Sequence, residues 1–311
     1  MPPRETDEER ADFASALRSV AEEGPMPQAE VDTLSMLEGP DLASFREAWQ
    51  TLSAPARARL LRALHNAAET RLRLDFSALN RLALQDEDPV VRLAGIEAVI
   101  EDRSLDLFSG LLTILNNDPH VELRVAAAED LARFALLAEL EDLDRDSSEQ
   151  LRTQLLARAR DENDDPRVRS AALAALGYFS DVAMMEELAT AFSSPALRLG
   201  AVRGMGRSAD PRWTDRLMPV LGSEDPRMRA EAARALGEIE DERAVTPLVE
   251  LMDDPELPVR LAVIEALGHI GTEEGREALL FLAEDPQDVI REAAEKALGE
   301  LEEGESDPLD F

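Results

Sequence analysis

The same stretch of residues recurs along the chain at an interval near thirty residues. The segment "SEDPRMRAEAARALGEI" begins at Ser223, "DDPELPVRLAVIEALGHI" begins at Asp253, and "EDPQDVIREAAEKALGEL" begins at Glu284. Aligned on an Asp-Pro or Ser-Pro step, the copies are separated by 30, 47, 29, 31, 29 and 31 residues, with the prolines at Pro89, Pro119, Pro166, Pro195, Pro226, Pro255 and Pro286. A period near thirty residues is typical of stacked-repeat proteins. It predicts an elongated array in place of a single globule.

Each copy has the pattern of a helix that begins at its proline. The Asp or Ser before the proline can accept hydrogen bonds from the first free backbone N–H groups, and the fixed φ of proline suits the first helical position. The clearest copies close with a Leu-Gly pair, at Leu176-Gly177, Leu236-Gly237, Leu267-Gly268 and Leu298-Gly299. We expect the glycine to end the helix in a left-handed conformation. Shorter apolar helices are predicted between these copies, at 244–252 and 275–283, so each unit is a helical hairpin.

One hairpin cannot bury its apolar face alone, so the copies are expected to stack, each covering its neighbour. The combination of Asp-Pro, Val-Arg, an alanine-rich core and Leu-Gly is clearest in "DDPELPVRLAVIEALGHIG". It resembles HEAT repeats of the phycobilisome-lyase-like type over about residues 75–300. The resemblance implies an all-α fold, an α-α superhelix of the armadillo-like solenoid type. In such a solenoid the first helices lie on the convex side and the second helices line the concave side.

The chain divides into three parts on this interpretation. Residues 1–74 have helical patterns without clean repeats and are expected to form a divergent N-terminal helical cap, because end units must present a polar outside. Residues 75–300 form the solenoid, and its 47-residue interval holds an insertion near 136–150, expected as a lengthened helix plus a longer loop. Residues 301–311 are acidic and contain turn formers, which predicts a disordered tail.

An arginine follows each repeat proline by three or five residues. In HEAT repeats of the type that the chain resembles, an Asp six residues before this arginine contributes to a ladder of ion pairs between turns. Four copies keep both residues, as Asp86 and Arg92, Asp118 and Arg124, Asp254 and Arg260, and Asp285 and Arg291. In the other three copies Asn163, Phe192 and Ser223 stand at the Asp position. The ladder, a structural feature, is therefore expected to be broken in the middle of the chain.

The charge of the chain limits its partners. A formal net charge of -33, from 66 acidic and 33 basic residues, opposes binding to nucleic acid or an anionic membrane, because neutralising phosphates needs clustered Lys and Arg. The acidity fits either solubility in a salty or hot cytoplasm or attraction of a basic partner. The polar N-terminus and the lack of any run of about eighteen apolar residues predict a cytoplasmic protein. With no cysteine, thiolate chemistry is excluded.

No catalytic or metal-binding pattern is found in the sequence. The histidines His65, His120 and His269 lie far apart and form no His-Glu pair, which the iron enzyme deoxyhypusine hydroxylase, also built on HEAT repeats, would require. We therefore expect no cofactor, no metal and no enzymatic activity. The alternative is a bilin-lyase-like or other modifying factor that acts with a second subunit, because bilin lyases share the repeat type.

The second helices indicate where a partner would bind. Counting the repeat arginine as position 0 and turning about 100° per residue, positions +1 and +5 point farthest from the core. Candidate partner-binding residues on this concave face are Leu93, Val125, Leu199 and Leu261 at +1, and Arg203, Arg234 and Glu265 at +5. An apolar stripe beside charges is typical of protein interaction surfaces. The prediction is a protein–protein interaction scaffold that grips a helix or extended segment of another protein; otherwise the leucines are buried between neighbouring helices.

Overall fold

The computed structural model of the chain describes residues 17, 26–71, 73–99 and 102–306. Over these residues the secondary structure consists of α-helices, short 3-10 helices and turns, without a β-strand, which confirms the expected all-α class. The contacts divide the chain into two units, Met1–Phe134 and Ala135–Phe311. None of the described helices has the length and the apolar run that a membrane span needs.

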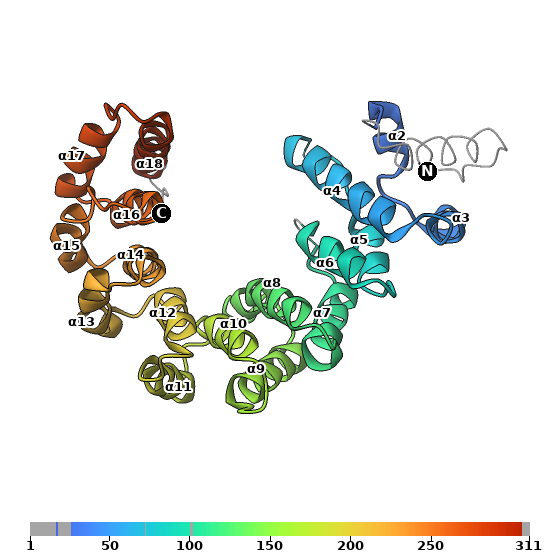
Figure 1. Cartoon of the computed structure of the whole chain (residues 1–311), viewed down its shortest axis with the longest axis horizontal. Coiled ribbons are helices and arrows are strands. Elements are labelled where there is room, and N and C mark those ends of the chain that lie inside the picture. The colour runs from blue at the N-terminus through green and yellow to red at the C-terminus, as the bar shows by residue number, and fades with distance from the viewer. Residues whose placement is uncertain (1–16, 18–25, 72, 100–101, 307–311) are drawn as a thin grey trace. The chain divides into compact units, whose positions relative to one another are not determined.

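Unit 1 contains helical hairpins of the predicted kind (Figure 1). Its helices are α2 (Gln28–Thr33), α3 (Gly39–Trp49), α4 (Ala54–Thr70), α5 (Ser77–Ala83), α6 (Pro89–Glu97), α7 (Leu105–Asn117) and the first part of α8 (Val121–Glu139). Helices α3, α5 and α7 are first helices, and α4, α6 and α8 are second helices that carry the repeat arginines. Phe45, Trp49, Leu60 and Leu64 belong to the buried core of this unit.

Unit 2 contains the more regular repeats. Its second helices are α10 (Pro166–Leu176), α12 (Arg198–Arg207), α14 (Pro226–Ile239), α16 (Leu257–Ile270) and α18 (Asp288–Ser306). Its first helices are α9 (Arg145–Arg160), α11 (Val182–Phe192), α13 (Thr214–Leu217), α15 (Val245–Val249) and α17 (Glu273–Leu282). Each second helix packs against the next one in the chain. Figure 1 shows α12, α14 and α16 along the inner side of the curve of this unit, with α13, α15 and α17 along the outer side.

The predicted helix starts are confirmed in three of the six copies in which an Asp precedes the proline; in the copies of Asp118, Asp254 and Asp285 the helix begins two residues after the proline. Asp88, Asp165 and Asp225 are the N-caps of α6, α10 and α14, and each side chain accepts a hydrogen bond from a backbone N–H of the first turn. The carboxylate satisfies one of the free donors of the helix and favours the positive end of its dipole. In the Ser194-Pro195 copy the helix begins only at Arg198, after a turn.

The predicted role of the Leu-Gly glycines is wrong. The backbone of Gly177 is right-handed, with φ of -58°, and α14 and α16 continue past their glycines to Ile239 and Ile270. The residues that end these two helices in a left-handed conformation are Glu240 and Gly271, with φ of 57° and 67°.

The glycine at position +8 instead allows the second helices to approach one another. A Cβ added to Gly177 would lie 2.2 Å from the carbonyl oxygen of Gly204, and one added to Gly237 would lie 2.6 Å from the Cα atom of Ala266. The partner is the small residue at position +6 of the next repeat, in the pairs Gly177 with Gly204, Gly206 with Ala235, Gly237 with Ala266, and Gly268 with Ala297. Gly299, in the last second helix, has no atom within 4 Å of such a Cβ.

The expected boundaries differ from the structure at three places. The division between the units falls inside α8, after Phe134, and the described part of the predicted cap contains the hairpin of α3 and α4. The insertion near 136–150 lengthens α8 and α9 to 19 and 16 residues and leaves only a short connection. Residues 301–306 of the predicted tail continue α18, because glutamate is a good helix former. Residues 307–311 lie outside the described residues, as do 1–16 and 18–25 of the cap.

The repeat arginines make two kinds of contact. The arginine of one repeat reaches the Asp of the next in the pairs Arg57–Asp86 (2.8 Å), Arg92–Asp118 (2.8 Å) and Arg229–Asp254 (2.7 Å). The arginine also donates to the carbonyl six residues before it, in Arg92, Arg124, Arg198, Arg229 and Arg291. Arg198 lies in addition over the ring of Phe192, which stands at an Asp position.

At the C-terminal end the expected pairing changes. Arg260 donates to the side-chain oxygen of Gln287, and Asp285 accepts a hydrogen bond from the backbone N–H of the same Gln287. Arg57 lies inside the predicted cap, so the ladder begins one hairpin earlier than the sequence pattern indicated.

Candidate functional site

The inner row of second helices in unit 2 carries most of the predicted binding residues. Leu199 on α12 and Leu261 on α16 are half-buried. At the equivalent +1 positions, Ala230 on α14 is buried, with 4% of its surface exposed, and Ser170 on α10 is half-buried. The side chains at position +1 are therefore less exposed than the turn of about 100° per residue predicted, because the glycine contacts bring neighbouring helices close enough to cover them.

The corresponding residues of unit 1 have a similar exposure. Leu93 on α6 and Val125 on α8 are half-buried. They belong to unit 1 and are described apart from the inner row of unit 2.

Charged residues at +5 connect three helices of the inner row. Arg203 of α12 binds Glu231 of α14 through two hydrogen bonds of 2.9 Å, from Nε to Oε1 and from Nη2 to Oε2. Glu231 is buried, with 6% of its surface exposed. Arg234 lies 3.9 Å from Oε2 of Glu231 and 3.7 Å from Oε2 of Glu265 on α16. Arg203 is thus held by the protein itself, whereas the side chains of Arg234 and Glu265 are 41% and 54% exposed.

Glu238, farther along α14, adds an unusual carboxylate to this face. Its Oε2 lies against the backbone of α12, where a Cβ added to Gly206 would come within 2.4 Å of it. Loss of water around the carboxylate raises the pKa of Glu238 to about 7, and the negative charges of Glu231 and Glu265 act in the same direction.

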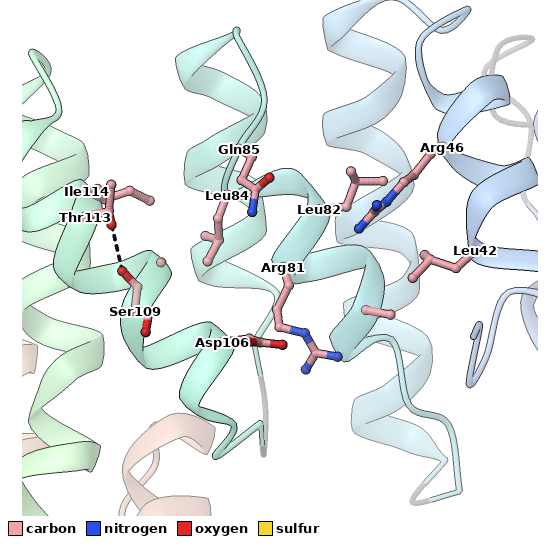
Figure 2. A pocket seen from close by; sticks show the side chains of 12 residues that line it. Leu42, Arg46, Arg81, Leu82, Leu84, Gln85, Asp106, Ser109, Thr113 and Ile114 are labelled. Atoms are coloured by element: carbon pink, nitrogen blue, oxygen red, sulfur yellow. Dashed lines mark hydrogen bonds between the residues drawn. The ribbon is translucent and has the colours of Figure 1, made fainter. Parts of the chain in front are cut away.

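A groove of about 630 Å³ lies between the first helices of unit 1 (Figure 2). One wall is α3, with Leu42 and Arg46, and the opposite wall is α7, with Asp106, Ser109, Gly110, Thr113 and Ile114. Helix α5 and the residues after it lie between the two walls and contribute Ala78, Arg81, Leu82, Leu84 and Gln85. Helix α5 has only seven residues, so α3 and α7 remain apart on either side of it.

Two polar side chains that line this groove are held by hydrogen bonds within unit 1. The guanidinium of Arg81 binds Asp102 at 2.6 Å and Ser104 at 3.2 Å. The hydroxyl of Thr113, on the wall of the groove, donates to the carbonyl of Ser109. This groove could not be predicted from the sequence, because its lining residues follow no repeat pattern.

His65 and His120 lie on unit 1, outside the residues that line its groove, and His269 is exposed in the last turn of α16. His120 lies 3.1 Å from Asp118, a ladder residue, and His65 lies 3.5 Å from Glu69 on its own helix. Within the described residues no three His, Asp or Glu side chains are grouped so that they could hold a metal ion. Asp144 caps the N-terminus of α9, where its side chain accepts hydrogen bonds from the backbone N–H groups of Asp146 and Ser147.

Comparison with known families places HEAT repeats in unit 2. Residues 182–262 and 241–299 match the family described as HEAT repeats. These ranges contain the Leu-Gly copies of α14, α16 and α18, so the HEAT part of the sequence resemblance is confirmed. The match is to HEAT repeats in general and does not specify the phycobilisome-lyase-like type. No curated protein matches the chain.

Comparison with solved structures found similarities of low sequence identity and low TM-score. A structure of Escherichia coli YibA is 17% identical, covers 96% of this chain and 99% of its own, and has a TM-score of 0.43. Human deoxyhypusine hydroxylase in complex with glycerol is 21% identical, with coverages of 95% and 97% and a TM-score of 0.33. A structure that describes Kap95p binding to RanGDP is 14% identical, covers 98% of this chain and 48% of its own, and has a TM-score of 0.46. Similarities with these sequence identities and TM-scores support no conclusion about the activity or the partners of this chain.

Proposed function

We propose that the chain is a non-enzymatic adaptor that holds a partner protein on the inner row of its second helices. The observation that carries the proposal is the continuous row of α12, α14 and α16, which presents half-buried leucines beside partly exposed charges. HEAT repeats build extended concave surfaces, and such surfaces serve protein binding.

The chemistry of the row favours a helix or an extended segment as the bound element. Leu199 and Leu261 offer shallow apolar contacts, and they lie on the two helices that flank α14. Arg234 and Glu265 present opposite charges to solvent, so a segment with both an acidic and a basic side chain fits them. Arg203 orients this pair, because it holds Glu231, the carboxylate that Arg234 also faces.

Nucleic acid and anionic lipid are excluded as partners in this proposal. The net charge of -33 repels polyanions. The cations of the inner row are compensated, since Arg203 is paired with Glu231 and Arg234 lies between two carboxylates.

The test compares the partners of the intact protein with those of the variant Leu199→Glu/Leu261→Glu. Both proteins are immobilised in equal amounts, and bound proteins are quantified by mass spectrometry. The matched control is Leu280→Glu, which adds a charge on α17, where Leu280 is 55% exposed. We expect the inner-row variant to lose specific partners and the control to keep them, with helical circular dichroism unchanged in both.

Two outcomes would reject the proposal. If the folded inner-row variant keeps every partner of the intact protein, the inner row is not the binding surface. If the protein together with a co-purified subunit turns over a tetrapyrrole substrate, it is a modifying factor and not a passive adaptor.

A further inference from the structure

A second surface in unit 2 has exposed apolar side chains where folding alone does not require them. Leu136 and Leu140 at the C-terminal end of α8 are 38% and 60% exposed, and Val182 at the start of α11 is 72% exposed. These are three of the nine large apolar side chains that are exposed among the described residues. Leu136 and Leu140 lie at the place where the chain departs from its thirty-residue period, and Val182 lies in the next repeat.

The three side chains belong to one continuous surface. The backbone N–H of Leu140 donates to the carbonyl of Leu136 at 3.0 Å, so the two leucines are one helical turn apart on the same side of α8. Glu139 lies on that side too, and it accepts a hydrogen bond of 2.6 Å from the hydroxyl of Ser180. Val182 follows Ser180 by two residues, which brings the start of α11 to the leucines. We call this patch the α8–α11 surface.

The rim of the α8–α11 surface is acidic. Exposed carboxylates follow the two leucines along the chain, at Glu139, Glu141, Asp142, Asp144 and Asp146. Hydrogen bonds from the side chain and the backbone N–H of Ser147 lower the pKa of Asp144, which therefore stays charged at neutral pH. Arg145 is an exposed base at this rim, and Arg152 is held by Asp181 and Glu149 at 3.0 and 3.2 Å.

The surface is held in place before any partner arrives. The N–H of Asp142 donates to the carbonyl of Leu137 at 2.8 Å, and that of Glu141 donates to Ala138 at 3.2 Å, with Glu141 at φ of 62°. These bonds form a Schellman motif, which fixes the end of α8. The Arg152–Asp181 ion pair ties α9 to the start of α11. A partner that docks here loses little entropy in ordering the surface.

We propose that the α8–α11 surface docks a cationic amphipathic segment of a partner protein. The apolar side chains of the segment cover Leu136, Leu140 and Val182, and its Lys or Arg side chains face the acidic rim. Charge complementarity selects this occupant, because an acidic segment or an anionic lipid surface would be repelled by the rim and by the net charge of -33. The insertion then has a function, since the lengthened α8 carries Leu136 in its last turn and Leu140 directly after its end.

The probe is a fluorescein-labelled amphipathic peptide of leucine and lysine, and its reference is a peptide of the same composition in scrambled order. Fluorescence anisotropy measures both affinities with the full chain. The variant Leu140→Ser/Val182→Ser removes two anchors without changing the charge. Its matched control is Leu280→Ser/Phe281→Ser on α17, whose side chains are 55% and 72% exposed.

We expect Leu140→Ser/Val182→Ser to weaken binding of the amphipathic peptide about ten-fold, and the α17 control to leave it unchanged. A second variant, Glu141→Gln/Asp142→Asn, removes rim charge and is expected to weaken binding and flatten its dependence on salt. The proposal is overturned if the α8–α11 and α17 variants bind equally, or if the scrambled peptide binds as tightly as the amphipathic one. Either result would mean that the net charge alone attracts the peptide.

Discussion

Replacing Gly237 by alanine tests how the second helices stack. The Cβ of the new residue would lie 2.6 Å from the Cα atom and 2.8 Å from the Cβ atom of Ala266 on α16. Both atoms belong to the backbone or are fixed to it, so a rotamer change cannot relieve the clash and α14 must move away from α16. The same substitution at Gly299, which occupies position +8 of the last repeat, meets no atom within 4 Å.

The expected magnitude is a balance of two effects. Alanine favours a helix over glycine by about 1 kcal/mol, and this gain applies equally to Gly237 and Gly299, because both lie inside helices. Overpacking in a tight interface costs about 1–3 kcal/mol. We therefore expect Gly237→Ala to lower the free energy of unfolding by up to about 2 kcal/mol, and Gly299→Ala to raise it by up to about 1 kcal/mol.

Urea unfolding of both variants provides the measurement. Circular dichroism follows the helices of the whole chain. Trp213 is buried directly before α13, the first helix of the hairpin that α14 completes, so its fluorescence reports on the affected region. Trp49 is replaced by Phe in all proteins compared, so that only Trp213 is observed. If Gly237→Ala is as stable as Gly299→Ala, the helices do not approach through their glycines and the stacking argument is wrong.

Three further predictions concern single side chains. Asp254→Asn should lower the free energy of unfolding by about 2 kcal/mol, because it breaks the buried two-bond pair with Arg229. Asp285→Asn should lower the free energy of unfolding by less, since Arg260 donates to Gln287 and not to this carboxylate. Thermal unfolding compares the two variants, and equal losses of stability would contradict the ladder of ion pairs. Glu141→Gly should raise the free energy of unfolding by about 1 kcal/mol, because glycine adopts φ of 62° without strain. Urea unfolding measures this difference, and a loss of stability would show that the backbone of Glu141 is not strained. Between pH 4.5 and about 7 the ionisation of Glu238, whose native pKa is raised, should lower the free energy of unfolding as the pH rises. Glu238→Gln should remove this slope in urea titrations at several pH values, and an unchanged slope would assign it to other groups.

The all-α repeat fold was predictable because it depends on local signals that recur. The Asp-Pro steps cap helices where Asp88, Asp165 and Asp225 stand, and these caps act within one turn of the chain. Tertiary contacts could not be predicted in the same way. Gly237 has the sequence context of a helix end, and only its distance to Ala266 shows that it serves packing. The groove of unit 1 depends on the spacing of α3, α5 and α7, which no single helix encodes.

The glycine contacts also explain why the predicted binding face changes character. Close approach of neighbouring second helices covers position +1, so that Ala230 is buried and Leu261 is half-buried. At position +5 the long charged side chains of Arg234 and Glu265 keep a large exposed surface, whereas the small Ala174 is buried. A partner on the inner row would thus meet charges before it meets leucines. Selectivity on this face should therefore depend on the order of charges along α12, α14 and α16, with the apolar stripe adding shallow contact area.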